Sequence, residues 1–280
     1  MRTEADLIAE VNRSGFPLQL GVERLVLETA DVAAIWDVRY VEHHWQHPST
    51  NREGFIDLVL TQRQGVGELV IECKRFQDAD WTFLQKKARR SVDRAKGLVS
   101  INRPTRRTVG WHDLNVTLDS PESEFCVVVG QDRDARPMLE RLSATAIESV
   151  EALAAEDVQH QFQFPEVSSS SLRVYFAVIL TTARLNLCEY DPASLDTLRG
   201  TLNGSVTELP FVRFRKQLSA GDSSDMPTRQ MGVKHYMVSQ AKERTVFVVN
   251  TAHALKFLRY LQVDDGRLQD IHDRAQRIAR

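Results

Sequence analysis

The sequence predicts an α/β protein in which a central mixed sheet is flanked by helices. Three observations lead to this prediction. Runs of apolar and β-branched residues recur along the chain, polar or Gly-containing connections separate them, and amphipathic segments of helical period precede and follow them. The elements of the N-terminal part are expected in the order αβββαβα, followed by a β-rich C-terminal extension.

The first expected element is a short helix near the N-terminus. Thr3 is positioned to cap it, and acidic residues occupy its first turn. Leu7, Ile8 and Val11 define its apolar face. At 3.6 residues per turn, Glu4 falls at the centre of that face, so it is the acid expected to point inward.

Three strands are expected next, over residues 34–47, 54–60 and 68–75. The first is rich in aromatic and β-branched residues. The second and third are apolar runs joined by residues 61–67, a polar segment with two glycines that is typical of a hairpin. The three strands therefore form the start of the predicted sheet.

A helix, a strand and a second helix complete the expected αβββαβα core. The helix is predicted over residues 80–96, with Asp80 as its cap and apolar residues at helical spacing. The strand is predicted over 125–130, as a buried run. The last helix is predicted over 137–159, because Pro favours the first turn of a helix.

Residues 1–165 are therefore expected to form the core, and residues 172–280 an α/β extension of it or a second lobe. The serine-rich segment between them is too short for a good interdomain linker, which favours an extension of the same sheet. The elements expected in this half are strands over 174–180, 183–187, 211–216 and 245–250 and helices over 252–261 and 267–280.

Asp57, Glu72 and Lys74 are charged residues inside the two apolar strands of the hairpin, where a core would favour Val or Ile. Side chains alternate along a strand, so Glu72 and Lys74 share a face, and Asp57 joins them in a suitable register. Two carboxylates on neighbouring strands can hold a hard divalent cation. A lysine beside it can orient or deprotonate a water or stabilise charge at phosphorus, which predicts metal-assisted phosphodiester hydrolysis. The alternative is a surface hairpin with a solvated Glu72–Lys74 pair.

Asp57 is followed fifteen positions later by Glu72-Cys73-Lys74, which resembles the D…(D/E)-x-K signature of the PD-(D/E)XK, restriction-endonuclease-like superfamily. The resemblance implies that Asp57, Glu72 and the main-chain carbonyl of Cys73 bind Mg²⁺, with Mn²⁺ as a possible substitute. It also implies that Lys74 serves catalysis. One departure is visible, because Ile56 stands where the family has a Pro.

A third acid is expected from the first helix. Glu4, followed by the pair Gly15-Phe16, resembles the opening of Mrr-type restriction endonucleases, in which a helical Glu precedes a Gly-aromatic pair. This resemblance implies that Glu4 is part of the catalytic site. The alternative is that Glu4 only stabilises its helix, because a negative charge interacts favourably with the positive N-terminal end.

Basic residues after the motif are candidates for phosphate contacts. Arg75 follows it directly, and Gln85 lies where some branches of the superfamily place a helical Gln that supports the site. The Tyr that those branches have four residues later is Arg89 here. The candidates for nucleic-acid binding are Arg75, Gln85, Lys86, Lys87, Arg89 and Arg90. The alternative is that the lysines and arginines form the solvated face of a helix.

The composition sets limits on the partners of the protein. The 36 Lys and Arg residues against 38 Asp and Glu residues give a net charge of −2, so any nucleic-acid footprint must be local. Three widely spaced cysteines predict reduced thiols rather than disulfides. The absence of a signal peptide and of long apolar runs predicts a cytoplasmic protein that does not contact membranes.

The expected function is that of a metal-dependent nuclease, with DNA as the expected substrate and restriction, phage defence or repair as the setting. The family resemblance also implies a possible homodimer whose two sites would cut opposite strands. The alternative is a catalytically inactive nucleic-acid-binding or scaffold module with the same fold. RNA also stays open as a substrate, because nothing in the sequence reports on a 2′-hydroxyl.

Overall fold

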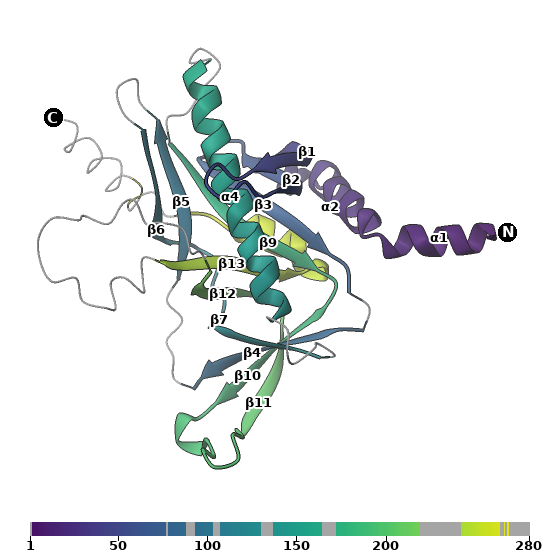
Figure 1. The fold of residues 1–280 in the computed structure, drawn as a ribbon, viewed down its shortest axis with the longest axis vertical. Helices are drawn as coiled ribbons and strands as arrows, with labels where there is room; N and C mark the ends of the chain where they lie inside the picture. Colours follow the sequence, from purple (N-terminus) through teal and green to yellow (C-terminus); the bar gives the residue numbers. More distant parts are fainter. Residues whose placement is uncertain are drawn as a thin grey trace, which may run out of the picture.

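The computed structural model describes residues 2–76, 78–87, 93–102, 107–129, 137–163, 172–218, 242–263, 266 and 268. These residues form a nine-stranded mixed sheet, a smaller four-stranded sheet beside it, and helices on both faces of the larger one (Figure 1). The predicted α/β class, with a central mixed sheet flanked by helices, is therefore confirmed.

The main sheet has the strand order β1-β2-β3-β9-β13-β12-β7, and β5 also pairs with β9 and carries β6. Neighbours from β1 to β3 are antiparallel, whereas β3–β9 and β9–β13 are parallel. The strands are β1 (Trp36–Gln46), β2 (Glu53–Gln62), β3 (Gly67–Lys74), β5 (Arg94–Asn102), β6 (Arg107–Asn115), β7 (Glu122–Ser123), β9 (Leu172–Thr181), β12 (Phe211–Gln217) and β13 (Glu243–Asn250).

The second sheet has the order β11-β10-β4-β8 and lies below the main sheet in Figure 1. Its central pair, β10 and β4, is parallel, and both outer pairs are antiparallel. The strands are β4 (Asp80–Lys86), β8 (Phe125–Val128), β10 (Arg184–Tyr190) and β11 (Gly204–Leu209).

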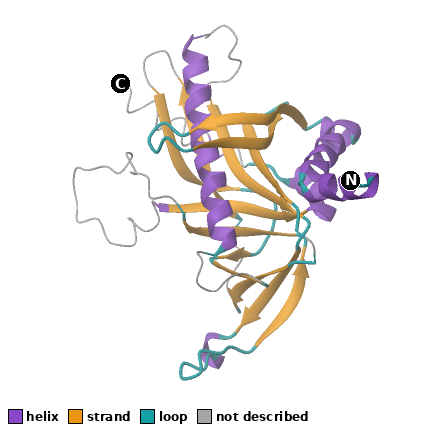
Figure 2. Ribbon diagram, turned by 45° about the vertical axis from the view of Figure 1, so that its right-hand side comes forward, coloured by secondary structure: helices purple, strands orange, loops and turns teal. Residues whose placement is uncertain are grey.

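The helices divide between the two faces of the main sheet (Figure 2). The long helix α4 packs on one face, and α2, α3 and α6 pack on the other. The helical segments are α1 (Glu4–Arg13), α2 (Phe16–Glu28), α3 (Ala30–Ala33), α4 (Met138–Gln163), η1 (Pro192–Ser194), η2 (Thr251–His253) and α6 (Ala254–Tyr260). Thr3 caps α1 as predicted, through a capping box with Asp6.

Alternation along the central strands supplies a hydrophobic core on each face of the sheet. Val59 and Val70 pack under α4, whereas Leu60 and Ile71 pack against α2, α3 and α6. These side chains are at most 2% exposed. Strands covered on both faces read as continuous apolar runs, which explains the composition of β2 and β3.

The helix predicted over residues 80–96 is wrong. Residues 80–86 form β4 and residues 94–102 form β5. Trp81 and Phe83 are buried in the core, while Thr82 and Leu84 are less buried, which is the two-residue period of a strand. The apolar spacing of this segment also fits a helix, and the pairing of β4 with β10 and β8 decides the outcome.

Between β3 and α4 the described residues contain the strands β4 to β8 in place of the expected helix and single strand, so the order αβββαβα is not found there. The other expected strands and the helices near residues 3, 137 and 252 are present. The helix expected over 267–280 lies outside the described residues, except for residue 268. After residue 172, β9, β12 and β13 extend the main sheet, whereas β10 and β11 belong to the second sheet.

None of the helices formed by the described residues is long and apolar enough to cross a membrane.

Candidate active site

The charged residues of the hairpin meet where β2 and β3 part. The pairing of these strands ends at Leu58 and Ile71, and continuing its register sets Asp57 opposite Glu72. β3 continues beside β9 as far as the pair Lys74–Thr181. The carboxylate of Asp57 occupies the edge of β3 that β2 has left, where its Oδ2 accepts a hydrogen bond of 2.6 Å from the Cys73 amide.

Glu72 and Lys74 lie on the face of β3 that also carries Val70, the face on which α4 packs. Their side chains form an ion pair between Lys74 Nζ and Glu72 Oε1, and both are half-buried. The structure therefore brings Asp57, Glu72 and Lys74 together, as the register argument requires.

The Cys73 thiol points to the opposite face, where it is buried in the core with Ile71. Burial raises the pKa of this thiol, and its sulfur points away from Glu72 and Lys74, so it is not placed to bind a cation beside them. The amide and carbonyl of a strand residue point to the same side. Since the Cys73 amide faces Asp57, its carbonyl faces the same side and is the group from Cys73 that fits a cation site.

Electrostatics set this cluster apart from an ordinary ion pair. Burial raises the pKa of Asp57 to about 6, and the nearby charge of Glu72 adds to this rise. The Cys73 amide and Lys74 lower the pKa only in part. Although burial opposes it, attraction to Glu72 and Asp57 raises the pKa of Lys74, so its amine is a cation at neutral pH.

Two further residues act on this cluster, Gln19 by a hydrogen bond and Glu42 by its charge, and neither was identified from the sequence. Gln19 of α2, itself buried, donates a hydrogen bond of 3.0 Å to the main-chain carbonyl of Asp57. Glu42 lies opposite Asp57 in the β1–β2 register, between the pairs Val41–Leu58 and His43–Ile56. The charge of Glu42 also raises the pKa of Asp57. The sequence shows an acidic residue at position 42, but it does not show the β1–β2 pairing that sets this residue opposite Asp57.

The backbone of Glu42 has a φ of 51°, in the left-handed region that favours glycine. A glutamate there costs on the order of 1 kcal/mol relative to glycine. The chain therefore holds a carboxylate beside Asp57 at a position where its backbone is strained.

The residues present fit a hard divalent cation. Two carboxylates and one lysine leave an excess negative charge, and the Cys73 carbonyl adds a neutral oxygen. Mg²⁺ commonly takes one or two carboxylates and completes its coordination with waters and substrate phosphates. Within the part of the chain that the structure describes, no group of three or more His, Cys, Asp or Glu side chains is arranged to hold a metal ion.

Glu4 does not join the cluster. None of the residues of α1, all of which the structure describes, is buried. Its apolar residues Leu7, Ile8 and Val11 are 52–54% exposed, and the helix projects from the body of the protein (Figure 1). Helical period identified the apolar face correctly, but it does not tell what covers that face, so the inward placement of Glu4 was wrong.

The predicted nucleic-acid residues separate into four groups. Arg75 follows β3 directly and is half-buried beside Lys74. Gln85 lies on a strand and donates to the carbonyl of Glu122, so its predicted role as a helical support is wrong. Lys86 and Lys87 lie at the far end of β4, about 20 Å along the strand from its first residue. Arg89 and Arg90 lie outside the described residues.

Comparison with protein-family models finds no match to this chain, and neither curated proteins nor solved structures provide a significant one.

Proposed function

We propose that this protein is a metal-dependent nuclease that hydrolyses phosphodiester bonds, with DNA as its substrate. The observation that supports this most is the meeting of Asp57, Glu72 and Lys74 at the parted ends of β2 and β3. A half-buried carboxyl with a raised pKa beside a second carboxylate and a lysine is typical of a functional site rather than of a stabilising ion pair.

We further propose that β1, β2, β3, α4 and β9 form a restriction-endonuclease-like core. The support is their arrangement: three antiparallel strands, then a helix that crosses one face, then a strand parallel to the third. In this interpretation, residues 80–128 are a β-rich insertion between the third strand and the helix.

In this site Asp57, Glu72 and the Cys73 carbonyl would hold Mg²⁺ or Mn²⁺. When bound, such an ion supplies Lewis-acid stabilisation of the reacting phosphate and lowers the pKa of a water. Lys74 is a cation, so its ammonium acts as a hydrogen-bond donor that orients the attacking water or a phosphate oxygen. Gln19 holds the main chain of Asp57, and the Cys73 amide holds its carboxylate.

The test is cleavage of plasmid and linear single-stranded DNA with Mg²⁺ or Mn²⁺, comparing the wild type with Lys74→Ala and Asp57→Asn. We expect metal-dependent cutting that both variants lose. Asp31→Asn is the matched control, because Asp31 forms an exposed ion pair with Arg259 between α3 and α6, on the other face of the sheet. Cutting that persists in Lys74→Ala would contradict the assignment of the site.

One observation favours a second candidate, a catalytically inactive nucleic-acid-binding module. The direct ion pair of Lys74 with Glu72 neutralises that acid without any metal. Calorimetric titration with Mg²⁺ separates the candidates. Binding by the wild type that Asp57→Asn abolishes supports the nuclease, and equal heats from both proteins support the inactive module.

A further inference from the structure

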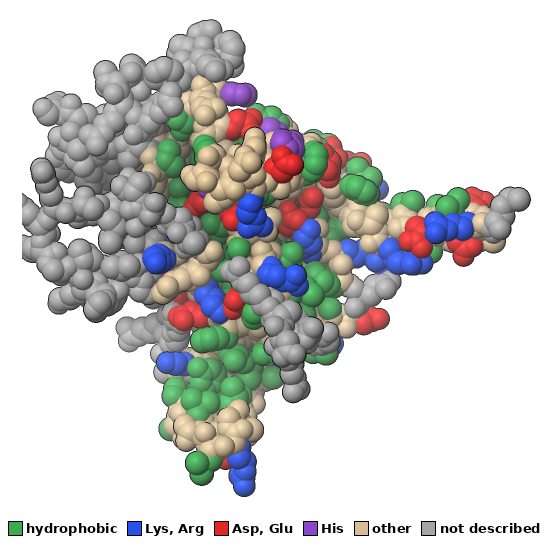
Figure 3. Space-filling view, in the orientation of Figure 1, with side chains coloured by type: hydrophobic (Ala, Val, Ile, Leu, Met, Phe, Trp, Pro, Cys, Tyr) green, Lys and Arg blue, Asp and Glu red, His purple; other side chains and the backbone are tan. Residues whose placement is uncertain are grey.

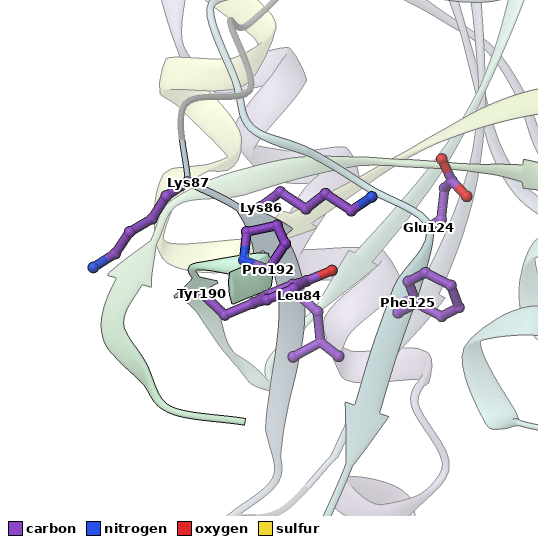
Figure 4. Close-up of a pocket in the computed structure, with 7 residues that line it drawn as sticks. All are labelled: Leu84, Lys86, Lys87, Glu124, Phe125, Tyr190 and Pro192. Carbon is purple, nitrogen blue, oxygen red and sulfur yellow. The ribbon is translucent and has the colours of Figure 1, made fainter. Parts of the chain in front are cut away.

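A cavity of about 460 Å³ opens on the second sheet, far along β4 from the carboxylate cluster. Figure 4 shows its walls, with Leu84 between an aromatic ring on each side and Lys86 extending across it. The residues that line it are Leu84, Lys86, Lys87, Glu124, Phe125, Tyr190 and Pro192.

The pocket lies on the outer face of this sheet. Trp81 and Phe83 of β4 point into the core under α4, so alternation directs Leu84 and Lys86 the other way. Phe125 pairs with Leu84 and Tyr190 with Lys86, and paired residues share a face.

Apolar side chains are unusually exposed here. Phe125 and Val127 of β8 are 54% and 56% exposed, and Val206 of β11 is 60% exposed. Figure 3 shows hydrophobic side chains gathered over the second sheet. A contiguous exposed apolar patch of this kind marks an interaction site.

The main chain at both aromatic residues is tied to β4 by hydrogen bonds. Ser123 Oγ donates to the Leu84 carbonyl at 2.7 Å and accepts from the Phe125 amide at 3.2 Å. The amide of Lys87 donates to the Tyr190 carbonyl at 2.8 Å. The strands that carry the two rings are therefore held together before a ligand arrives, which lowers the entropic cost of binding.

The charge at the pocket is mainly positive. Lys86 and Lys87 are exposed at the rim, and Lys216 Nζ lies 5.4 Å from the centroid of the Phe125 ring. Glu124 opposes these three lysines, and Glu140 forms an ion pair with Lys216. The pocket thus combines the exposed ring of Phe125 and the half-buried ring of Tyr190 with ammonium groups, which suits a flat, apolar ligand carrying negative charge.

We infer that this pocket binds single-stranded DNA, with one base against Phe125 and Tyr190 and the adjoining phosphates near Lys86 and Lys87. An unpaired base presents its whole face to an aromatic side chain, and every base has such a face. A duplex keeps its bases stacked on one another, so it cannot offer a base face to these rings. This inference rests on the proposed function for its context, and it deepens it by naming an unpaired strand as the bound form.

The measurement is the fluorescence anisotropy of a labelled twelve-residue oligothymidylate, titrated with the full chain in EDTA so that no cleavage occurs. We expect Phe125→Ala to weaken binding about tenfold or more, and Phe125→Trp to preserve it, since a ring supplies the stacking. Lys86→Ala and Lys87→Ala should each reduce the salt dependence, by about 0.7 in the slope of log K against log salt.

Leu27→Ala is the matched control, because Leu27 of α2 is 58% exposed, about as much as Phe125, but lies outside the second sheet and the pocket lining. It should bind like the wild type. The inference is overturned if Phe125→Ala binds as well as the wild type, or if oligothymidylate does not bind at all. It is also overturned if a duplex of the same length, or a polyglutamate peptide used as competitor, binds equally well.

The two proposals fail separately. Pocket-dependent binding without cleavage in Mg²⁺ would contradict the nuclease and leave the pocket supported. Metal-dependent cleavage together with unchanged binding by Phe125→Ala would contradict the pocket and leave the nuclease supported.

Discussion

Replacing Asp57 by asparagine should stabilise the folded protein at neutral pH while it removes the site. The carboxyl of Asp57 is half-buried and lies beside Glu72, and these surroundings raise its pKa from 3.8 to about 6. The folded state therefore holds this proton more tightly than the unfolded state does. The stability that comes from the protonated carboxyl is complete below pH 3.8 and is lost as the pH rises through about 6.

The size of the effect follows from the shift. A rise from 3.8 to about 6, at about 1.4 kcal/mol per unit, corresponds to about 3 kcal/mol at pH 7.5, as an upper value. Asparagine keeps an oxygen that can accept the Cys73 amide, so the hydrogen bond of 2.6 Å need not be lost. Asp57→Asn should thus increase the free energy of unfolding at pH 7.5 and change it little near pH 4.

Urea unfolding in EDTA at pH 4 and pH 7.5, followed by circular dichroism, measures both values. Asp31→Asn serves as the control of opposite sign, because a hydrogen bond from Arg259 lowers the pKa of Asp31, and its loss should destabilise the fold at pH 7.5. A lower stability of Asp57→Asn at pH 7.5, or an equal increment at both pH values, would refute the electrostatic reasoning.

Substitutions at Lys74, Glu42 and Trp81 test other parts of the structure. Lys74→Ala should lower cleavage at least a hundredfold and leave the circular dichroism spectrum unchanged, because one charged donor to a reacting phosphate is lost. Glu42→Gly should raise the free energy of unfolding by about 1 kcal/mol in urea titrations, since it relieves a left-handed residue. The same variant should weaken Mg²⁺ binding in calorimetry, whereas Glu42→Ala should weaken it without the gain in stability. Trp81→Ala should cost about 3–5 kcal/mol in urea unfolding, because this fully buried ring joins the second sheet to the core.

The hairpin and its charged residues could be predicted because local rules suffice there. β2 and β3 are neighbours in sequence, they are joined by a short turn, and two-residue alternation assigns their faces. The same rules put Asp57 opposite Glu72 once the register is known. The sequence alone could not supply that register, nor the parting of the strands at Leu58 and Ile71.

The segment over residues 80–96 shows where local rules end. The partner that makes β4 a central strand is β10, about a hundred residues later in the chain. Without that partner, the apolar spacing around Phe83 and Leu84 fits a helix equally well. Pairing with a strand that is distant in sequence outweighs the local helix propensity of such a segment.

Glu4 was expected near Asp57, but Glu42 is the acid that lies there, and local rules could not predict this either. The period of α1 is correct, but its apolar face is not covered by the main body of the protein. The proximity of Glu42 to Asp57 depends on the β1–β2 register and on a left-handed residue within β1. The local sequence pattern of residues 36–46 predicts neither this register nor the left-handed backbone of Glu42.

The position of β9 has a consequence for how the protein is made. β9 holds the charged end of β3, yet about a hundred residues lie between the two strands. Until Leu172–Thr181 has left the ribosome, a nascent chain carries Glu72 and Lys74 on an unsupported edge. Contacts so distant in sequence form late, and domains of this kind fold slowly. Glu72 and Lys74 therefore gain their β9 neighbour only after residue 181 has been synthesised.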